Sequence, residues 1–181
     1  MVKLGSTAIF FDGDNLRITI RDQGWLNRLT PEHIEKVIED KWGNPVSEAT
    51  IFINMDNSEG VKQGQLYGDA GWKVVHTPKL TAEGKCATDG YIFLAVMRAV
   101  NDTTISNIVI GSGDHDFLPI MKYVRGRKNL LIVTPTNGSN TIRKVGETIS
   151  MHDLYLNKVG KEVSGEGPFA TIFKNVFGDK A

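Results

Sequence analysis

The chain has 181 residues, enough for one domain with a substantial buried core. Its 21 Lys and Arg residues are balanced by 21 Asp and Glu residues, which argues against a protein that holds nucleic acid by bulk charge alone but leaves room for a local basic groove. Cys86 is the only cysteine, so the chain cannot form an internal disulfide. The early apolar run at 8–11 is too short for a signal peptide or a membrane span. We therefore expect a cytoplasmic protein that contacts no membrane.

The first half of the chain alternates apolar runs with helical patterns. The expected elements are a strand at 7–11, a short helix and a loop within 16–28, a helix at 31–42, a strand at 49–55, a helix at 61–70 and a strand at 72–76. Thr30 and Pro31 favour the start of the second helix. The first strand ends at Asp12, Gly13 and Asp14, so acidic residues follow directly where a buried strand stops.

The second half continues the same alternation. The expected elements are a helix at 88–100, a strand at 107–110, a helix at 117–125, a strand at 130–133 and a helix at 141–156 with a break at Gly146. Residues 88–100 are apolar on nearly every side, which predicts a central helix with Thr88 as N-cap and Asp89 in its first turn. A carboxylate in a first turn also stabilises a helix by itself, so Asp89 alone does not indicate a site.

Residues 1–158 are expected to form one domain. The stretch at 160–168 is rich in Gly and charge, which is typical of a linker, and residues 169–177 place apolar side chains at helical spacing. Two roles are open for the C-terminal segment 159–181. It packs on its own domain, or it docks on a partner, either a second copy of the chain or another protein.

Two carboxylates follow the strand at 107–110. Asp114 and Asp116 stand two residues apart in a turn that Gly111 and Gly113 allow. Like charges this close repel, so a divalent cation is their natural partner. The alternative is that both residues serve only in the turn, with Asp116 capping the helix that follows.

Repeated alternation of strand and helix predicts an α/β fold with three layers: a parallel sheet of about five strands, in the order 3-2-1-4-5, and helices on both faces. In this order the first and fourth strands lie side by side at the point where ligands usually bind. Three acidic clusters would then meet in one crevice: Asp12 with Asp14, Asp89, and Asp114 with Asp116. We expect a site for Mg²⁺ or Mn²⁺ that acts on phosphate esters, through either a metal-activated water or an Asp nucleophile.

Three motifs resemble the NYN family, a group related to PIN nucleases that includes LabA-like proteins. They are FDGDNL at 11–16, KCATD at 85–89 and SGDHDF at 112–117. The resemblance covers residues 5–157 in motif order and implies a PIN-like Rossmannoid fold and a divalent-metal-dependent ribonuclease. It assigns catalysis and metal binding to Asp12, Asp89, Asp114 and Asp116. The spacer between Lys85 and Asp89 departs from the shorter, glycine-containing spacer common in the family, which affects the assignment of Lys85 more than that of Asp89.

The resemblance also implies a mechanism, in which a metal-activated water attacks phosphorus in line on single-stranded RNA. Asn15 can order the loop after the first strand, and Ser112 can position Asp114 through a hydroxyl hydrogen bond. We expect the substrate to be contacted by Asn15, Ser112, Lys85, Arg125, Lys128 and Arg143. The wider set of cationic candidates adds Lys122, Arg127 and Lys144; for each of them alone, a solvated surface is the competing interpretation.

Two other functions are compatible with the sequence. The Asp12-Gly13-Asp14 motif resembles the paired aspartates of haloacid-dehalogenase-like phosphatases, but Leu16 departs from that pattern and no cap insertion is apparent. The second alternative is a noncatalytic module that binds RNA or protein, which the zero net charge and the apolar C-terminal segment favour. The full set of acidic residues argues against a pure scaffold. Clustered like charges have to be offset by a partner, and a scaffold has no use for them.

Overall fold

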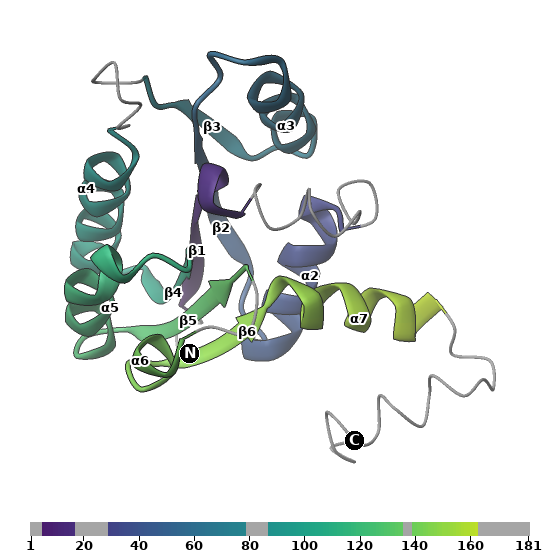
Figure 1. Cartoon of the computed structure of the whole chain (residues 1–181). Coiled ribbons are helices and arrows are strands. Elements are labelled where there is room, and N and C mark those ends of the chain that lie inside the picture. Colours follow the sequence, from purple (N-terminus) through teal and green to yellow (C-terminus); the bar gives the residue numbers. More distant parts are fainter. Residues whose placement is uncertain (1–4, 17–28, 79–86, 136–138, 163–181) are drawn as a thin grey trace.

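The computed structural model describes residues 5–16, 29–78, 87–135 and 139–162 (Figure 1). These residues form a parallel six-stranded sheet in the order β3-β2-β1-β4-β5-β6. The strands are β1 (Ser6–Asp12), β2 (Val46–Ile53), β3 (Lys73–His76), β4 (Ile105–Gly111), β5 (Asn129–Thr134) and β6 (Glu147–Ser150). The predicted α/β class and the order 3-2-1-4-5 are confirmed, and a sixth strand extends the sheet beyond β5.

Helices cover both faces of the sheet, which gives the three layers expected (Figure 1). They are α2 (Pro31–Trp42), α3 (Ser58–Asp69), α4 (Thr88–Asn101), α5 (Leu118–Arg125), α6 (Asn140–Arg143) and α7 (Met151–Glu162), and a single 3-10 turn, η1 (His115–Phe117), precedes α5. Core side chains of α4 and α5 pack on one face, and those of α2 and α7 pack on the other. None of the described helices is both long and apolar enough to cross a membrane.

Strand β1 lies at the centre of the sheet and is buried on both faces. Its side chains alternate, so that Ala8 and Phe10 join the core under α4 and α5 while Ile9 and Phe11 join the core under α2 and α7. All four are fully buried. A strand with two buried faces needs an uninterrupted apolar run, which is the pattern that predicted it.

The helix predicted at 141–156 with a break at Gly146 is right about the break but wrong about the residues that follow it, because these form strand β6. The chain forms the short helix α6, then β6, and only then helix α7. Strand β6 pairs with β5, with Leu131 opposite Glu147 and Thr134 opposite Ser150. β-Branched residues are favoured on a pleated edge, and β6 carries two of them, Thr148 and Ile149. Tertiary pairing with the open edge of β5 therefore overrides the weak helical pattern.

Helix α4 is not the central helix that its composition predicts. It buries one stripe, formed by Ile92, Val96, Ala99 and Val100, against the sheet and α5. Leu94 on the opposite side is 73% exposed. The helix therefore covers one face of the sheet, and its surplus apolar residues lie on the surface. The expected elements at 17–28 and 163–181 lie outside the described residues.

Gly111 is the position where the sheet has no room for a side chain. A Cβ at Gly111 would lie 2.3 Å from Cδ1 of Phe11 on the neighbouring strand β1. We expect Gly111→Ala to lower the free energy of unfolding by about 1–3 kcal/mol, because Phe11 is fully buried and must move. Gly90 is the matched control, since a Cβ there meets nothing within 4 Å. Gly90→Ala in helix α4 should raise the free energy of unfolding by about 0.5–1 kcal/mol. Urea unfolding measures both variants, and a Gly111→Ala variant as stable as the wild type would contradict this packing.

Candidate active site

The carboxyl ends of β1 and β4 lie side by side at the centre of the sheet. The two strands pair in parallel, with Phe11 opposite Gly111. The residues that follow them, Asp12 and Ser112, are therefore neighbours although they are 100 positions apart in the sequence. The predicted adjacency of the first and fourth strands is confirmed, and it brings the first and last acidic motifs together.

Asp12 is the most deeply buried carboxylate of this edge, with only 6% of its surface exposed. One carboxylate oxygen accepts the Asn15 N–H at 3.1 Å, and the other accepts the Ser112 hydroxyl at 3.3 Å. Burial raises the pKa of Asp12 to about 7; the negative charges of Asp14 and Asp89 also raise this pKa, while the two hydrogen bonds lower it. Asp12 is thus a desolvated carboxylate among like charges.

The loop after β4 is built on the hydroxyl of Ser112. Ser112 Oγ accepts the Asp114 N–H at 3.1 Å while it donates to Asp12, so one buried hydroxyl links the two acidic motifs. The expected contact of Ser112 with Asp114 is therefore present, through the backbone. Asn15 Oδ1 accepts the Gly113 N–H at 2.8 Å, which ties the loop after β1 to the loop after β4.

Asp114, and not Asp116, is the capping residue of this loop. The Asp114 carboxylate accepts the Asp116 N–H at 2.9 Å and caps the turn η1. Helix α5 itself begins at Leu118 after Phe117, with no side-chain cap. The predicted cap at Asp116 is wrong because Asp116 lies inside the 3-10 turn, and the cap position of α5 is Phe117. The Asp116 side chain, which makes no cap, stays exposed.

Asp89 reaches the same edge from helix α4. Burial raises its pKa, and the carboxylates of Asp114 and Asp116 raise it further. The Asp89 carboxylate therefore lies close enough to the loop after β4 for the charges there to raise its pKa. Its own charge helps to raise the pKa of Asp12. The predicted N-cap at Thr88 is wrong: the cap position is Ala87, which provides no side-chain hydrogen bond. Thr88 Oγ1 donates instead to Thr77 Oγ1 at 2.9 Å, and this bond joins the start of α4 to the residue after β3.

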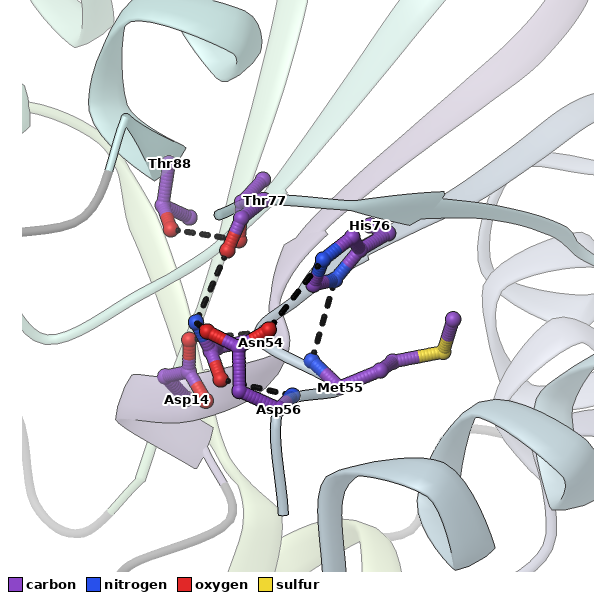
Figure 2. Close-up of polar contacts among 7 residues, drawn as sticks. All are labelled: Asp14, Asn54, Met55, Asp56, His76, Thr77 and Thr88. Carbon is purple, nitrogen blue, oxygen red and sulfur yellow. Dashed lines mark hydrogen bonds and ion pairs between the residues drawn. The ribbon is translucent and has the colours of Figure 1, made fainter. Parts of the chain in front are cut away.

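A second polar network, which the sequence did not reveal, lies at the ends of β2 and β3 (Figure 2). Its hub is Asn54, which is 3% exposed. The Asn54 side chain donates to the Thr77 carbonyl at 3.0 Å and to the Asp56 carboxylate at 2.9 Å, and its backbone N–H donates to Asp14 at 3.1 Å. The network joins β1, β2 and β3 and, through Thr77, the start of α4. Its only sequence signal is a polar residue directly after a buried strand.

His76 closes this network on its exposed side (Figure 2). Its Nδ1 accepts the Met55 N–H at 3.1 Å, and its Nε2 lies 3.4 Å from Asp56 Oδ1. Because Nδ1 is an acceptor, the ring proton of the neutral imidazole sits on Nε2, toward Asp56. Both ring nitrogens are occupied, so His76 serves to hold the β2 and β3 loops together.

The cationic residues expected at the substrate are not all on this edge. Helix α5 starts at the carboxyl edge and runs back, so Arg125 and Lys128 lie at the opposite, amino-terminal edge, beside the starts of β4 and β5. Arg143 lines a groove along the edge strand β6, together with Thr134 and Asp153. Lys85 lies outside the described residues. Of the expected substrate contacts in the described ranges, Asn15 and Ser112 are the ones hydrogen bonded within the acidic loops.

The donors at this edge suit a hard divalent cation, because carboxylate oxygens are the ligands that Mg²⁺ and Mn²⁺ prefer. Within the described ranges, no Lys or Arg forms an ion pair with any of the four carboxylates Asp12, Asp89, Asp114 and Asp116. In the same ranges, no three His, Cys, Asp or Glu side chains stand close enough together to hold one ion. The four carboxylates are thus near neighbours that repel one another and do not form a closed ligand set.

Comparison with known proteins identifies the family. The family model of the NYN domain matches residues 6–152, so the chain belongs to the NYN domain family, whose fold is of the PIN-like nuclease type. A crystal structure of a protein of unknown function, VPA0982 from Vibrio parahaemolyticus, has the same fold with a TM-score of 0.68 and 18% sequence identity. The similarity covers 85% of this chain and 97% of that one. A search of curated proteins finds no match.

The buried charge of Asp12 should make stability depend on pH. Its pKa in the folded chain is about 7, above the ordinary value of 3.8. Ionisation therefore costs stability: the penalty is absent below pH of about 4, grows as pH rises and is complete above about 7. With a chelator present, we expect Asp12→Asn to be more stable than the wild type by about 1–3 kcal/mol at high pH and to lose this advantage at low pH.

Urea unfolding across this pH range measures the difference. Asp69→Asn on the exposed side of α3 is the control for the loss of one negative charge. If Asp12→Asn kept the pH profile of the wild type, the carboxylate would not be desolvated in the folded chain.

Proposed function

We propose that this chain is a divalent-metal-dependent ribonuclease that hydrolyses single-stranded RNA at the carboxyl edge of its sheet. The observation that carries the proposal is the convergence of carboxylates from three distant segments on one edge of the sheet. The charge of Asp89 helps to raise the pKa of the buried Asp12, and the charges of Asp114 and Asp116 help to raise the pKa of Asp89. Within the described ranges, no Lys or Arg forms an ion pair with any of the four. Repulsion among carboxylates lowers the stability of the fold unless a bound cation offsets it.

Asp12, Asp89, Asp114 and Asp116 are the residues that would hold the cation. A bound Mg²⁺ or Mn²⁺ would neutralise charge on the phosphodiester and lower the pKa of a water at the site. Because the carboxylates do not form a closed ligand set, we expect cation binding to draw them closer together. The loop that carries Asp114 and Asp116 is half-buried to exposed, so it can shift more easily than β1.

The chain itself supplies orientation. Asn15 and Ser112 donate to the two oxygens of Asp12, so the plane of this carboxylate is set before any ligand arrives. Asn15 also accepts from Gly113, which links the loop after β1 to the loop after β4. His115 is hydrogen bonded to Ser139 at 2.8 Å, and Ser139 caps α6. We therefore assign His115 to holding the β4 loop against the start of α6, and not to proton transfer.

The purified protein should cleave single-stranded RNA with Mn²⁺ or Mg²⁺ and should stop when a chelator is added. Asp12→Asn and Asp114→Asn each remove a ligand charge, so each should lower kcat by more than the roughly 10–100-fold that loss of an outer-shell partner costs. Ser112→Ala removes such a partner and should fall within that range. Cleavage of a labelled oligonucleotide, followed on denaturing gels, measures all three.

Asp69→Asn is the matched control for charge and should cleave like the wild type. Cleavage that survives in Asp12→Asn would mean that this edge is not the active site. Hydrolysis of a chromogenic phosphomonoester by a protein that leaves RNA intact would favour the phosphatase alternative. Absence of both activities, with RNA still bound, would favour a noncatalytic module.

Metal binding should be detectable without any substrate. A cation that binds only the folded chain raises its stability, by about 2.7 kcal/mol when the free ion is at a hundredfold excess over Kd. We expect Mn²⁺ to raise the Tm of the wild type and to raise that of Asp114→Asn much less. Equal shifts in the two proteins would place the Mn²⁺ somewhere other than the carboxylate cluster.

A further inference from the structure

A polar pocket lies at the edge of the sheet opposite the acidic site. It has a volume of about 470 Å³ and opens at the amino-terminal ends of β4 and β5. Three cationic residues line it, Arg125, Arg127 and Lys128, with the polar side chains of Thr103, Ser106 and Asn129. Strand β4 separates the pocket from the acidic site by its seven residues, which at ~3.3 Å per residue amounts to about 20 Å.

The charged side chains that line this pocket are all cationic. Among the residues that the structure describes, no Asp or Glu lines it. Lys128 donates to the carbonyls of Asp102 and Ile105, at 2.8 and 2.5 Å. Hydrogen bonds from Thr104 lower the pKa of the Asp102 carboxyl, and the charge of Lys128 lowers it further. Lys128 is therefore partly committed to holding the turn before β4. The available positive charge belongs to the two arginines.

Arg125 and Arg127 are held in place but keep donors to spare. Arg125 donates through one nitrogen to the Lys144 carbonyl at 3.0 Å, and Arg127 donates through one nitrogen to the Tyr123 carbonyl at 3.2 Å. The Arg127 guanidinium also stacks 3.8 Å from the centre of the Tyr123 ring. A guanidinium has five N–H donors, so these contacts fix each group and leave further donors for a ligand. Both side chains are exposed, and neither forms an ion pair with a carboxylate of the described ranges.

Pre-oriented guanidinium groups beside hydroxyl and amide side chains suit a phosphate, whose oxygens accept paired hydrogen bonds. We propose that this amino-edge pocket binds a phosphate group, and that the backbone of single-stranded RNA supplies it at a distance from the acidic edge. The RNA part of the inference rests on the proposed function; the phosphate part does not. A free nucleotide offers the same phosphate chemistry and is the alternative source.

The test measures binding apart from cleavage. In an Asp114→Asn background without metal, fluorescence anisotropy follows a labelled single-stranded RNA that is long enough to span both edges. Replacing Arg125 and Arg127 by Gln should weaken binding about tenfold at low salt. It should also lower the slope of log K against log salt by about 0.7 for each phosphate that the variant no longer neutralises. Lys62→Gln with Lys73→Gln removes the same charge from exposed positions on α3 and β3 and should change both quantities far less.

Conservative variants separate charge from folding. Arg125→Lys with Arg127→Lys keeps the charge and should retain most of the salt slope, and urea unfolding checks that each double variant folds. Equal RNA binding by the Gln variant and the Lys62/Lys73 control would overturn the RNA proposal. In a parallel titration with uridine monophosphate, a loss confined to the nucleotide would assign the pocket to a free phosphate compound and would overturn its RNA role.

Cleavage kinetics distinguish this inference from the proposed function. With metal and intact carboxylates, the Arg125/Arg127 Gln variant should raise KM for the long RNA and leave kcat unchanged, and it should cleave a dinucleotide as the wild type does. A fall in kcat on the dinucleotide would show that the arginines act at the acidic site and would overturn a separate pocket. If the wild type cleaves no RNA at all, the proposed function fails, while the binding experiment still decides the pocket.

Discussion

The repulsion among carboxylates at one edge of the sheet is the constraint on which this site depends. Parallel strands end at the same edge, and the order of the strands places β1 beside β4. Asp12 is therefore fixed in a buried position next to the loop that carries Asp114 and Asp116. Helix α4 adds Asp89, whose pKa is raised by burial and by the charges of Asp114 and Asp116. The strand order therefore places these carboxylates near one another, and the buried core around β1 holds Asp12 at this edge.

Neutral donors hold these carboxylates in position. The Ser112 hydroxyl and the Asn15 N–H orient Asp12, and the Asp116 N–H donates to Asp114. An arginine could have made the same contacts and would have cancelled the charge. A hydroxyl or an amide fixes direction but leaves the negative potential in place. This choice of donors favours a site that is organised before a cation arrives and that still attracts one.

The sequence predicted the parts of the fold that rest on long, uninterrupted patterns. Strand β1 could be read directly, because both faces are buried and its run is wholly apolar. Strand β6 could not, since it has only four residues and exists because β5 offers it an edge. Two helix caps also differ from prediction, because local backbone geometry decides them. Asp114 caps the turn where Asp116 was predicted as a cap, and Ala87 takes the N-cap position that was predicted for Thr88. Asn54 gave only a weak signal, a polar residue directly after a buried strand, because its role depends on Thr77, a contact that only folding creates.

The positions of the cations show where charge patterns mislead and where topology corrects them. Charge alone grouped Arg125 and Lys128 with the acidic residues, as if every candidate phosphate contact served one site. A helix that follows a parallel strand returns to the other edge of the sheet, so the end of α5 must lie far from Asp114. Within the described ranges, the four carboxylates Asp12, Asp89, Asp114 and Asp116 lie at the carboxyl edge, while Arg125, Arg127 and Lys128 line the pocket at the amino edge. These carboxylates would repel a polyanion, and these cations would attract it. In the proposed function, a cation held by the four carboxylates would offset this repulsion, while Arg125 and Arg127 at the amino edge would hold the RNA strand.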